Sequence, residues 1–263
     1  MSKPATTSPQ TMNEGGYEIE IAVQGYPGKS VCHGGLGWST IALLRGHGRV
    51  TLIDTGAFGQ RNLIQERLAA HNLKPADVTD VLLTHSHWDH SINWVMFPNA
   101  KIYIDGGELA WSLAEPWGTT PVPELYVREL DRSTQTVRIA PGASTIPGIQ
   151  IHSAPGHTPG HVFFVLKGET RDVIFTGDAA KNRTEILSRS ADMTYDQNVS
   201  RQSIEAIWEI WRRRPGTILV PGHDVPMVLD AGEPRYLAER GAGIAAWFDT
   251  TLDQLKVFDI TAS

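Results

Sequence analysis

The sequence of 263 residues predicts an α/β protein, and three observations support this. Short runs rich in β-branched residues recur along the chain, and amphipathic helical segments interrupt them. Hydrophobic residues make up 41% of the chain, which is enough for one sizeable core. No charged or Pro/Ser-rich stretch marks a linker in the middle. We therefore expect a single domain over residues 17–263, preceded by a polar, disordered segment over residues 1–16.

The expected strands are short and end in turn residues or in polar side chains. They cover Tyr17–Val23, Ser39–Leu44, Arg49–Ile53, Val78–Thr84, Lys101–Ile104, Thr136–Ala140, Ile149–Ser153, Val162–Lys167, Asp172–Thr176 and Thr217–Val220.

Helices are expected where apolar residues recur every three or four positions. This spacing predicts helices over Gln60–His71 and Ser200–Arg213, and we expect a further helix around Arg235–Leu255. Residues 105–130 are rich in Trp, Pro and Gly and predict a long binding loop, with room for a helix near Glu108–Leu113.

Composition narrows the functional classes. The formal net charge of −6 disfavours general nucleic-acid binding. The N-terminus lacks the apolar core of a signal peptide, and no run of about 18 apolar residues occurs, so we expect a cytoplasmic protein that does not enter a membrane.

Cys32 is the single cysteine, which excludes an intramolecular disulfide. We interpret it as a small buried residue rather than a nucleophile paired with His33.

The strongest local signal is His85-Ser86-His87-Trp88-Asp89-His90, directly after an apolar strand. Imidazole and carboxylate groups are good ligands for cations such as zinc. Two sets of ligands on one loop suit two adjacent metals better than one. A solvated polar turn is the alternative, but unpaired polar groups beside a buried strand are costly.

Three further segments place a potential ligand after a strand and a glycine. They are Gly156-His157 within Pro-Gly-His-Thr-Pro-Gly-His, Gly177-Asp178, and Gly222-His223. Glycine allows the tight backbone path by which the next side chain reaches a shared centre. Each segment alone is a weak signal, but the four segments in this order are specific.

The order HxHxDH, GHTPGH, GD and PGH resembles the metallo-β-lactamase superfamily, and the resemblance extends from residue 52 to His223. It implies an αββα sandwich with metals at one edge, between two mixed sheets. It also implies a first metal on His85, His87 and His157, a second on Asp89, His90 and His223, and Asp178 as the bridge. Asp89 and Asp178 would be the catalytic residues. Asp54 and His161 would support the site without binding metal.

The resemblance implies two divalent cations. Zinc is the leading expectation, and manganese, iron, cobalt or nickel would suit the same ligands. Two ions about 3.5–4 Å apart lower the pKa of a shared water, and we expect the resulting hydroxide to attack a carbonyl carbon.

The expected substrate is a small molecule with an ester-like carbonyl, first of all a lactone, because the ligand set is similar to that of quorum-quenching lactonases. Those enzymes commonly carry a Tyr shortly after the bridging Asp, whereas Ala179, Ala180 and Lys181 follow it here. The alternatives are a thioesterase resembling the second glyoxalase, then a β-lactamase, a phosphodiesterase or nuclease, and an inactive metal-binding paralogue. The sequence leaves open whether the protein forms a homodimer.

The expected pocket residues are His33, Trp38, Trp111, Trp117, Lys181 and Tyr195.

Overall fold

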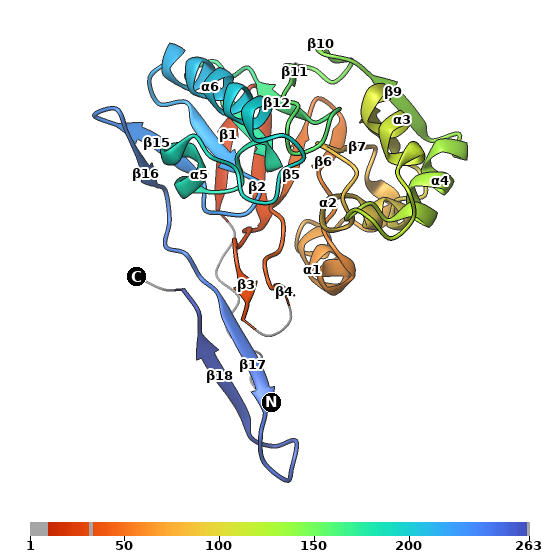
Figure 1. Cartoon of the computed structure of the whole chain (residues 1–263), viewed down its shortest axis with the longest axis vertical. Helices are drawn as coiled ribbons and strands as arrows, with labels where there is room; N and C mark the ends of the chain where they lie inside the picture. Colours follow the sequence, from red (N-terminus) through yellow and green to blue (C-terminus); the bar gives the residue numbers. More distant parts are fainter. Residues whose placement is uncertain (1–9, 32–33, 262–263) are drawn as a thin grey trace.

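Two sheets of seven strands face each other and form the centre of the molecule in this computed structural model, which describes residues 10–31 and 34–261 (Figure 1). The first sheet has the strand order β1-β2-β5-β6-β7-β8-β9. Its strands are β1 (Thr11–Glu14), β2 (Tyr17–Val23), β5 (Ile41–Gly46), β6 (Arg49–Ile53), β7 (Asp80–Leu82), β8 (Lys101–Asp105) and β9 (Thr136–Ile139). Strands β6 to β9 run parallel to one another, and the others pair antiparallel.

The second sheet has the order β10-β11-β12-β13-β14-β15-β16. Its strands are β10 (Gly142–Ala143), β11 (Ile149–Ser153), β12 (Val162–Leu166), β13 (Val173–Gly177), β14 (Ile218–Pro221), β15 (Met227–Asp230) and β16 (Glu233–Tyr236). Only β13 and β14 pair in parallel. Two small hairpins lie outside both sheets: β3 (Lys29–Ser30) with β4 (Gly34–Gly35), and β17 (Gly243–Trp247) with β18 (Leu255–Asp259).

Helices cover the outer face of each sheet. The first sheet carries α1 (Arg61–Ala70), α3 (Gly106–Ala114) and α4 (Glu124–Arg132), which bury Leu68, Leu109 and Val127 in one apolar cluster with its strands. The second sheet carries α5 (Arg183–Ser188) and α6 (Gln197–Arg213). A short helix, α2 (Trp88–Ser91), follows β7, and short 3₁₀ turns span Phe58–Gln60, Pro75–Asp77, Ile92–Met96 and Asp178–Ala180. No helix in the described part of the chain combines the length and the apolar run required to cross a bilayer.

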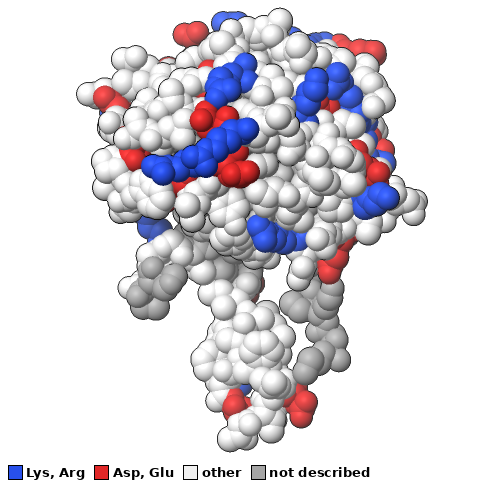
Figure 2. All heavy atoms as spheres, turned by 90° about the vertical axis from the view of Figure 1, so that its right-hand side faces the viewer, with Lys and Arg blue, Asp and Glu red and all other residues white. Residues whose placement is uncertain are grey.

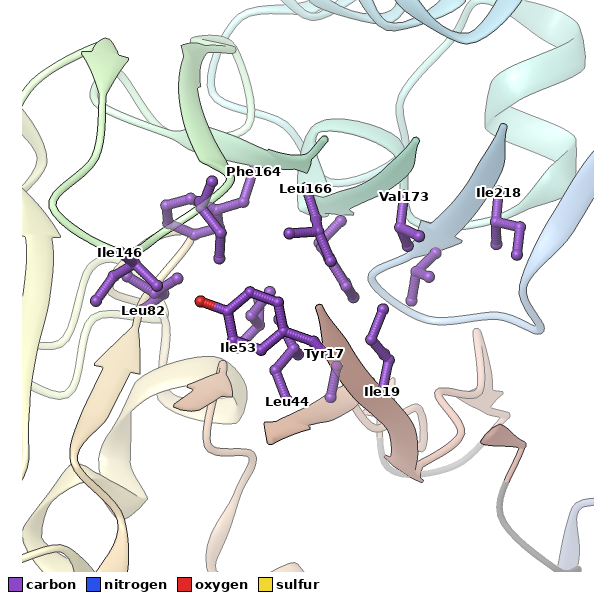
Figure 3. Packing of buried hydrophobic residues seen from close by; sticks show 14 of the residues in the cluster. Tyr17, Ile19, Leu44, Ile53, Leu82, Ile146, Phe164, Leu166, Val173 and Ile218 are labelled. Atoms are coloured by element: carbon purple, nitrogen blue, oxygen red, sulfur yellow. The ribbon is translucent and has the colours of Figure 1, made fainter. Parts of the chain in front are cut away.

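The core between the sheets consists of inward-facing side chains from both (Figure 3). Ile19, Leu44 and Ile53 of the first sheet pack against Phe164 and Val173 of the second. Burial of such side chains contributes about 1.5–3 kcal/mol each, and this apolar layer holds the two sheets together. The layers confirm the predicted αββα sandwich.

The parallel strands determine where polar side chains gather. In the first sheet, β6 and β7 lead to Asp54 and His85, while in the second sheet β13 and β14 lead to Asp178 and His223. The carboxyl ends of parallel strands share one edge of a sheet and are a common place for ligand sites. Backbone hydrogen bonds from Val162 N to Thr84 O (3.0 Å) and from Thr40 N to Gly222 O (2.6 Å) join the two sheets near this edge.

All ten predicted strands are present, three with the predicted bounds and seven with ends shifted by one or two residues, but three other expectations are wrong in whole or in part. Disorder over residues 1–16 fails at Thr11–Glu14, because β1 completes the edge of the first sheet beside β2. Within residues 105–130, the helix expected near Glu108–Leu113 is present as α3, but the loop expected after it is wrong from Glu124 onward, where α4 begins. The third error is the expected C-terminal helix around Arg235–Leu255.

Strands β16, β17 and β18 replace that helix. Gly241 and Gly243 interrupt the helical pattern, and the β-branched and aromatic side chains that follow favour extended backbone.

Candidate metal centre

Seven side chains from four loops converge at the carboxyl edge of the parallel strands, and we call this group the metal cage. His85 follows β7, and the loop continues through His87 into α2, which carries Asp89 and His90. His157, Asp178 and His223 come from loops of the second sheet. Six of the seven residues are buried, and Asp89 is partly exposed. The structure thus brings together every residue that the resemblance assigns to a metal.

One side of the metal cage is made only of imidazoles. His87 Nδ1 lies 2.9 Å from His157 Nε2, and the rings of His85 and His157 meet edge to face with centroids 4.8 Å apart. His85 hydrogen-bonds Thr84 Oγ1 through Nδ1 at 3.1 Å, whereas its Nε2 is buried and has no hydrogen-bond partner among the described residues. A buried nitrogen without a partner is costly unless a cation accepts its lone pair.

The other side combines imidazoles with carboxylates. His90 Nε2 lies 3.3 Å from His223 Nε2, and His223 Nε2 lies 3.4 Å from Asp89 Oδ2. Ligand atoms of Asp89, His90 and His223 all lie within 4.8 Å of one another, as do those of His85, His87 and His157. The residues present therefore fit divalent cations by both donor type and spacing.

Asp178 lies between the two sides and directs one oxygen toward each. Its Oδ1 is 3.0 Å from His90 Nε2 and 3.2 Å from His223 Nε2, while its Oδ2 is 3.3 Å from His157 Nε2. Gly177, at φ 50°, makes the tight turn that directs Asp178 into the cage at the end of β13. A carboxylate divided in this way can bind two neighbouring cations.

Asp54 contacts both the cage histidine His90 and the backbone before His85. Its Oδ2 lies 2.7 Å from His90 Nδ1, and its Oδ1 accepts a hydrogen bond from Thr84 N at 2.8 Å. These contacts direct the Nε2 atom of His90 toward the other ligand atoms of the metal cage. Such partners fix the ring orientation of a ligating histidine and raise its basicity.

His161, the other residue predicted to support the site, holds Asp178. Its Nε2 accepts a hydrogen bond from Asp178 N at 3.0 Å, and its ring stacks on His85 with centroids 4.8 Å apart. Burial lowers the pKa of His161 to about 3, so this ring stays neutral and able to accept that bond.

The imidazole side of the cage is electrostatically neutral. Burial lowers the pKa of His85 and His157 well below the usual value, and that of His87 to about 4. Neutral imidazole is the form that binds a cation.

On the other side of the cage, the carboxylates raise the pKa values of the histidines. Burial acts to lower the pKa of His90, but Asp178 and Asp89 outweigh it and raise that pKa well above its usual value. Burial also acts to lower the pKa of His223, but the charge and hydrogen bond of Asp178 together with the charge of Asp89 raise that pKa above its usual value. Burial acts to raise the pKa of Asp178, yet the neighbouring histidines hold it well below its usual range.

Glu108 is a functional candidate that the sequence reasoning missed. It is fully buried at the start of α3. Its Oε1 accepts from Ser86 N (2.9 Å) and Ser86 Oγ (2.7 Å), and its Oε2 accepts from Thr158 Oγ1 (2.7 Å) and Gly160 N (3.2 Å). This carboxylate joins the loop of His85 and His87 to the loop of His157. The sequence signal was weak: an acidic residue at the start of the helix expected near Glu108–Leu113.

The predicted pocket residues divide into two groups. Trp111 lies with its ring centroid 6.3 Å from that of His87, and Tyr195 packs edge-on against Trp111 at 5.9 Å. Lys181 is close enough to the cage to lower the pKa of His87, and its Nζ donates to Asp192 O at 2.6 Å.

Trp38 and Trp117 make their contacts elsewhere. Trp38 stacks on Tyr26 at 4.9 Å, and Trp117 lies under the guanidinium of Arg128. His33 and Cys32 lie outside the described residues.

This sandwich, with a cage of nitrogen and oxygen donors at the edge between its sheets, defines a metal-binding α/β protein. Comparison with known proteins gives the family. A model of the metallo-beta-lactamase superfamily matches residues 34–223, and the chain belongs to that superfamily. The chain spans 58% of the length of the first curated relatives that it matches.

Three similar proteins illustrate the relationship. An N-acyl homoserine lactonase of Bacillus cereus is 26% identical over 155 residues, and the match covers 58% of each chain. A putative metallo-beta-lactamase from Thermotoga maritima has a TM-score of 0.65 and 25% identity, with 81% of this chain and all of that chain covered. AidC, described as a dizinc quorum-quenching lactonase, has a TM-score of 0.69 at 15% identity, with coverage of 88% and 97%, and it supports the fold alone.

Proposed function

We propose that this protein is a dinuclear hydrolase that opens a small lactone. One observation carries the dinuclear part: the two carboxylate oxygens of Asp178 are divided between two groups of ligand atoms, with His90 and His223 near Oδ1 and His157 near Oδ2. A site for one cation would need only one of these groups.

In this proposal His85, His87 and His157 hold the first cation, Asp89, His90 and His223 hold the second, and Asp178 binds both. Zinc suits this set of ligands. When bound, the cations supply an activated water and a Lewis acid that polarises the substrate carbonyl. The protein contributes ligand orientation, through Asp54 and Glu108, and burial that excludes bulk water from the imidazole side.

The substrate class is proposed from the wall beside the cage. Trp111 and Tyr195 form an aromatic surface next to His87, and the exposed ring of Tyr195 forms its outer part. Apolar walls with few polar groups suit the acyl part of a small ligand. The similarity to lactonases over 58% of the chain points in the same direction.

Tyr195 is the proposed polar group on this wall. The tyrosine expected shortly after Asp178 is absent, and Ala179, Ala180 and Lys181 occupy those positions. The backbone of Tyr195 nevertheless donates to His157 O at 3.3 Å, which holds this residue beside the cage. We assign its hydroxyl the role of hydrogen-bond donor to the substrate carbonyl or to the leaving oxygen.

A panel of substrates tests the proposal. Zinc-reconstituted protein is assayed with aliphatic lactones, glutathione thioesters, a β-lactam and a phosphodiester. We expect kcat/KM to be highest for lactones, and Tyr195→Phe to lower kcat by about 10- to 100-fold as a lost polar contact does. Trp117→Phe is the matched control, because Trp117 contacts Arg128 and not the cage. A preference for another class would refute the lactone assignment and leave the metal cage standing.

A further inference from the structure

The C-terminal hairpin extends away from the body of the molecule (Figure 1). We call residues 243–259, which contain β17 and β18, the arm. Among the described residues, the hydrogen bonds of the arm join it to itself or to its own ends, for example Trp247 Nε1 to Leu252 O at 3.0 Å. An isolated two-stranded hairpin is at best marginally stable in water. The arm therefore needs a covering surface.

Both ends of the arm are fixed to the body. Before it, the guanidinium of Arg240 donates to the fully buried Asp224 at 2.8 Å. After it, Tyr26 OH donates to Ile260 O at 2.6 Å. The arm is thus held in a defined place at its base and is not a trailing end.

Both faces of the arm carry apolar side chains. Residues two apart along a strand share a face. Ala245 and Trp247 lie on the same face as their cross-strand partners Val257 and Leu255, while Ile244 lies opposite Phe258 on the other face. Trp247 is 50% exposed, Phe248 67% and Phe258 48%. A hairpin packed on one side only would have one polar face.

A groove of about 950 Å³ runs between the base of the arm and the body. Ile21 and Val23 of β2 and Leu63 of α1 line it from the body, and Ala245 and Val257 line it from the arm. The same chain therefore presents both a projecting apolar hairpin and an apolar groove beside it. This is the self-complementary arrangement that a two-fold dimer requires.

The available area is the size that a dimer needs. Seven large apolar side chains of the arm are exposed: Ile244, Trp247, Phe248, Leu252, Leu255, Val257 and Phe258. Covering them would remove on the order of 700 Å² of apolar surface per copy, close to the ~800 Å² per partner of a standard interface.

The charge on the arm distinguishes a protein partner from a lipid surface. Figure 2 shows a largely uncharged arm, with acidic residues near its far end. The arm contains Asp249, Asp253 and Asp259 but only one cation, Lys256. Segments that bind membranes are usually rich in Lys and Arg.

We propose that a second copy of this chain covers the arm, in a two-fold dimer in which each arm packs into the groove of the other copy. Sedimentation velocity of the whole chain tests this. Wild-type protein is expected to be dimeric at about 10 µM, because interfaces of this size reach micromolar affinity or better. The paired substitutions Trp247→Ser and Phe258→Ser should raise the dissociation constant at least about 100-fold, as loss of two aromatic anchors does.

A matched pair of substitutions on the body provides the control. Trp117 and Leu125 are 55% and 68% exposed, and neither lines the groove, so Trp117→Ser with Leu125→Ser should leave the dimer unchanged. Hydrogen exchange gives a second measurement: arm amides should be protected at high protein concentration and exchange quickly on dilution to the monomer. A monomeric wild type, a dimeric arm variant, or a monomer that floats with phosphatidylcholine vesicles through its arm would each overturn the proposal.

Discussion

The substitution Glu108→Gln tests how strongly the two ligand loops depend on one buried carboxylate. Each carboxylate oxygen of Glu108 accepts two hydrogen bonds, one of them from a backbone N–H. That N–H belongs to Ser86 at Oε1 and to Gly160 at Oε2. A glutamine amide has one oxygen and one NH₂ group. Whichever way it is oriented, one backbone N–H in the buried interior faces another donor.

An unsatisfied buried donor costs about 1–3 kcal/mol, so we expect the free energy of unfolding to fall by that amount. We also expect zinc affinity to fall by about 10- to 100-fold, as it does when a residue that orients metal ligands is changed. Urea unfolding of the metal-free protein gives the first quantity, and competition with a chromophoric chelator gives the second.

Glu124→Gln is the matched control, because the half-buried Glu124 also accepts a backbone hydrogen bond, from Gly118 N, but contacts no loop that carries a cage ligand through it. It should change neither the unfolding free energy nor the zinc affinity appreciably. If Glu108→Gln behaves like this control in both measurements, Glu108 does not hold the loops and the reasoning is refuted.

Three further predictions concern the cage and its packing. Asp178→Asn should reduce the bound metal, measured by mass spectrometry, to one ion per chain or fewer; two retained ions would disprove the bridge. Zinc binding to metal-free protein at pH 7 should release protons, because the raised pKa values of His90 and His223 favour the protonated form of these rings, and a metal displaces the proton. Calorimetry in buffers of different ionisation enthalpy detects this, and buffer-independent heats would contradict it. Gly160→Ala would place a Cβ 2.1 Å from Glu108 N and should destabilise the fold by at least about 1–3 kcal/mol, whereas Gly59→Ala meets no atom within 4 Å and should unfold like the wild type.

The sequence predicted the cage well because its ligands sit at strand ends. Val78–Thr84 is an apolar run that stops at His85, and Gly177 and Gly222 precede Asp178 and His223. Local sequence records both the strand and the turn in each case. The order of these ligand types along the chain carried the family resemblance, and the resemblance implied which residues share a metal.

Features that depend on distant partners were not predictable. Glu108 acquires its role only when α3 packs beside two loops that lie about 20 and 50 positions away in the chain. Trp38 and Trp117 resemble pocket residues by composition, but their rings pack on Tyr26 and Arg128. The sequence predicted a helix where the arm has strands, because apolar residues in a short, irregular pattern fit both the spacing of a helix and the alternation of a strand.

A map of anomalous scattering at the zinc edge, from crystals of the zinc-reconstituted protein, tests the two-metal cage most directly. The account predicts two peaks about 3.5–4 Å apart, one beside each carboxylate oxygen of Asp178. A single peak, or no peak among these histidines, would contradict it.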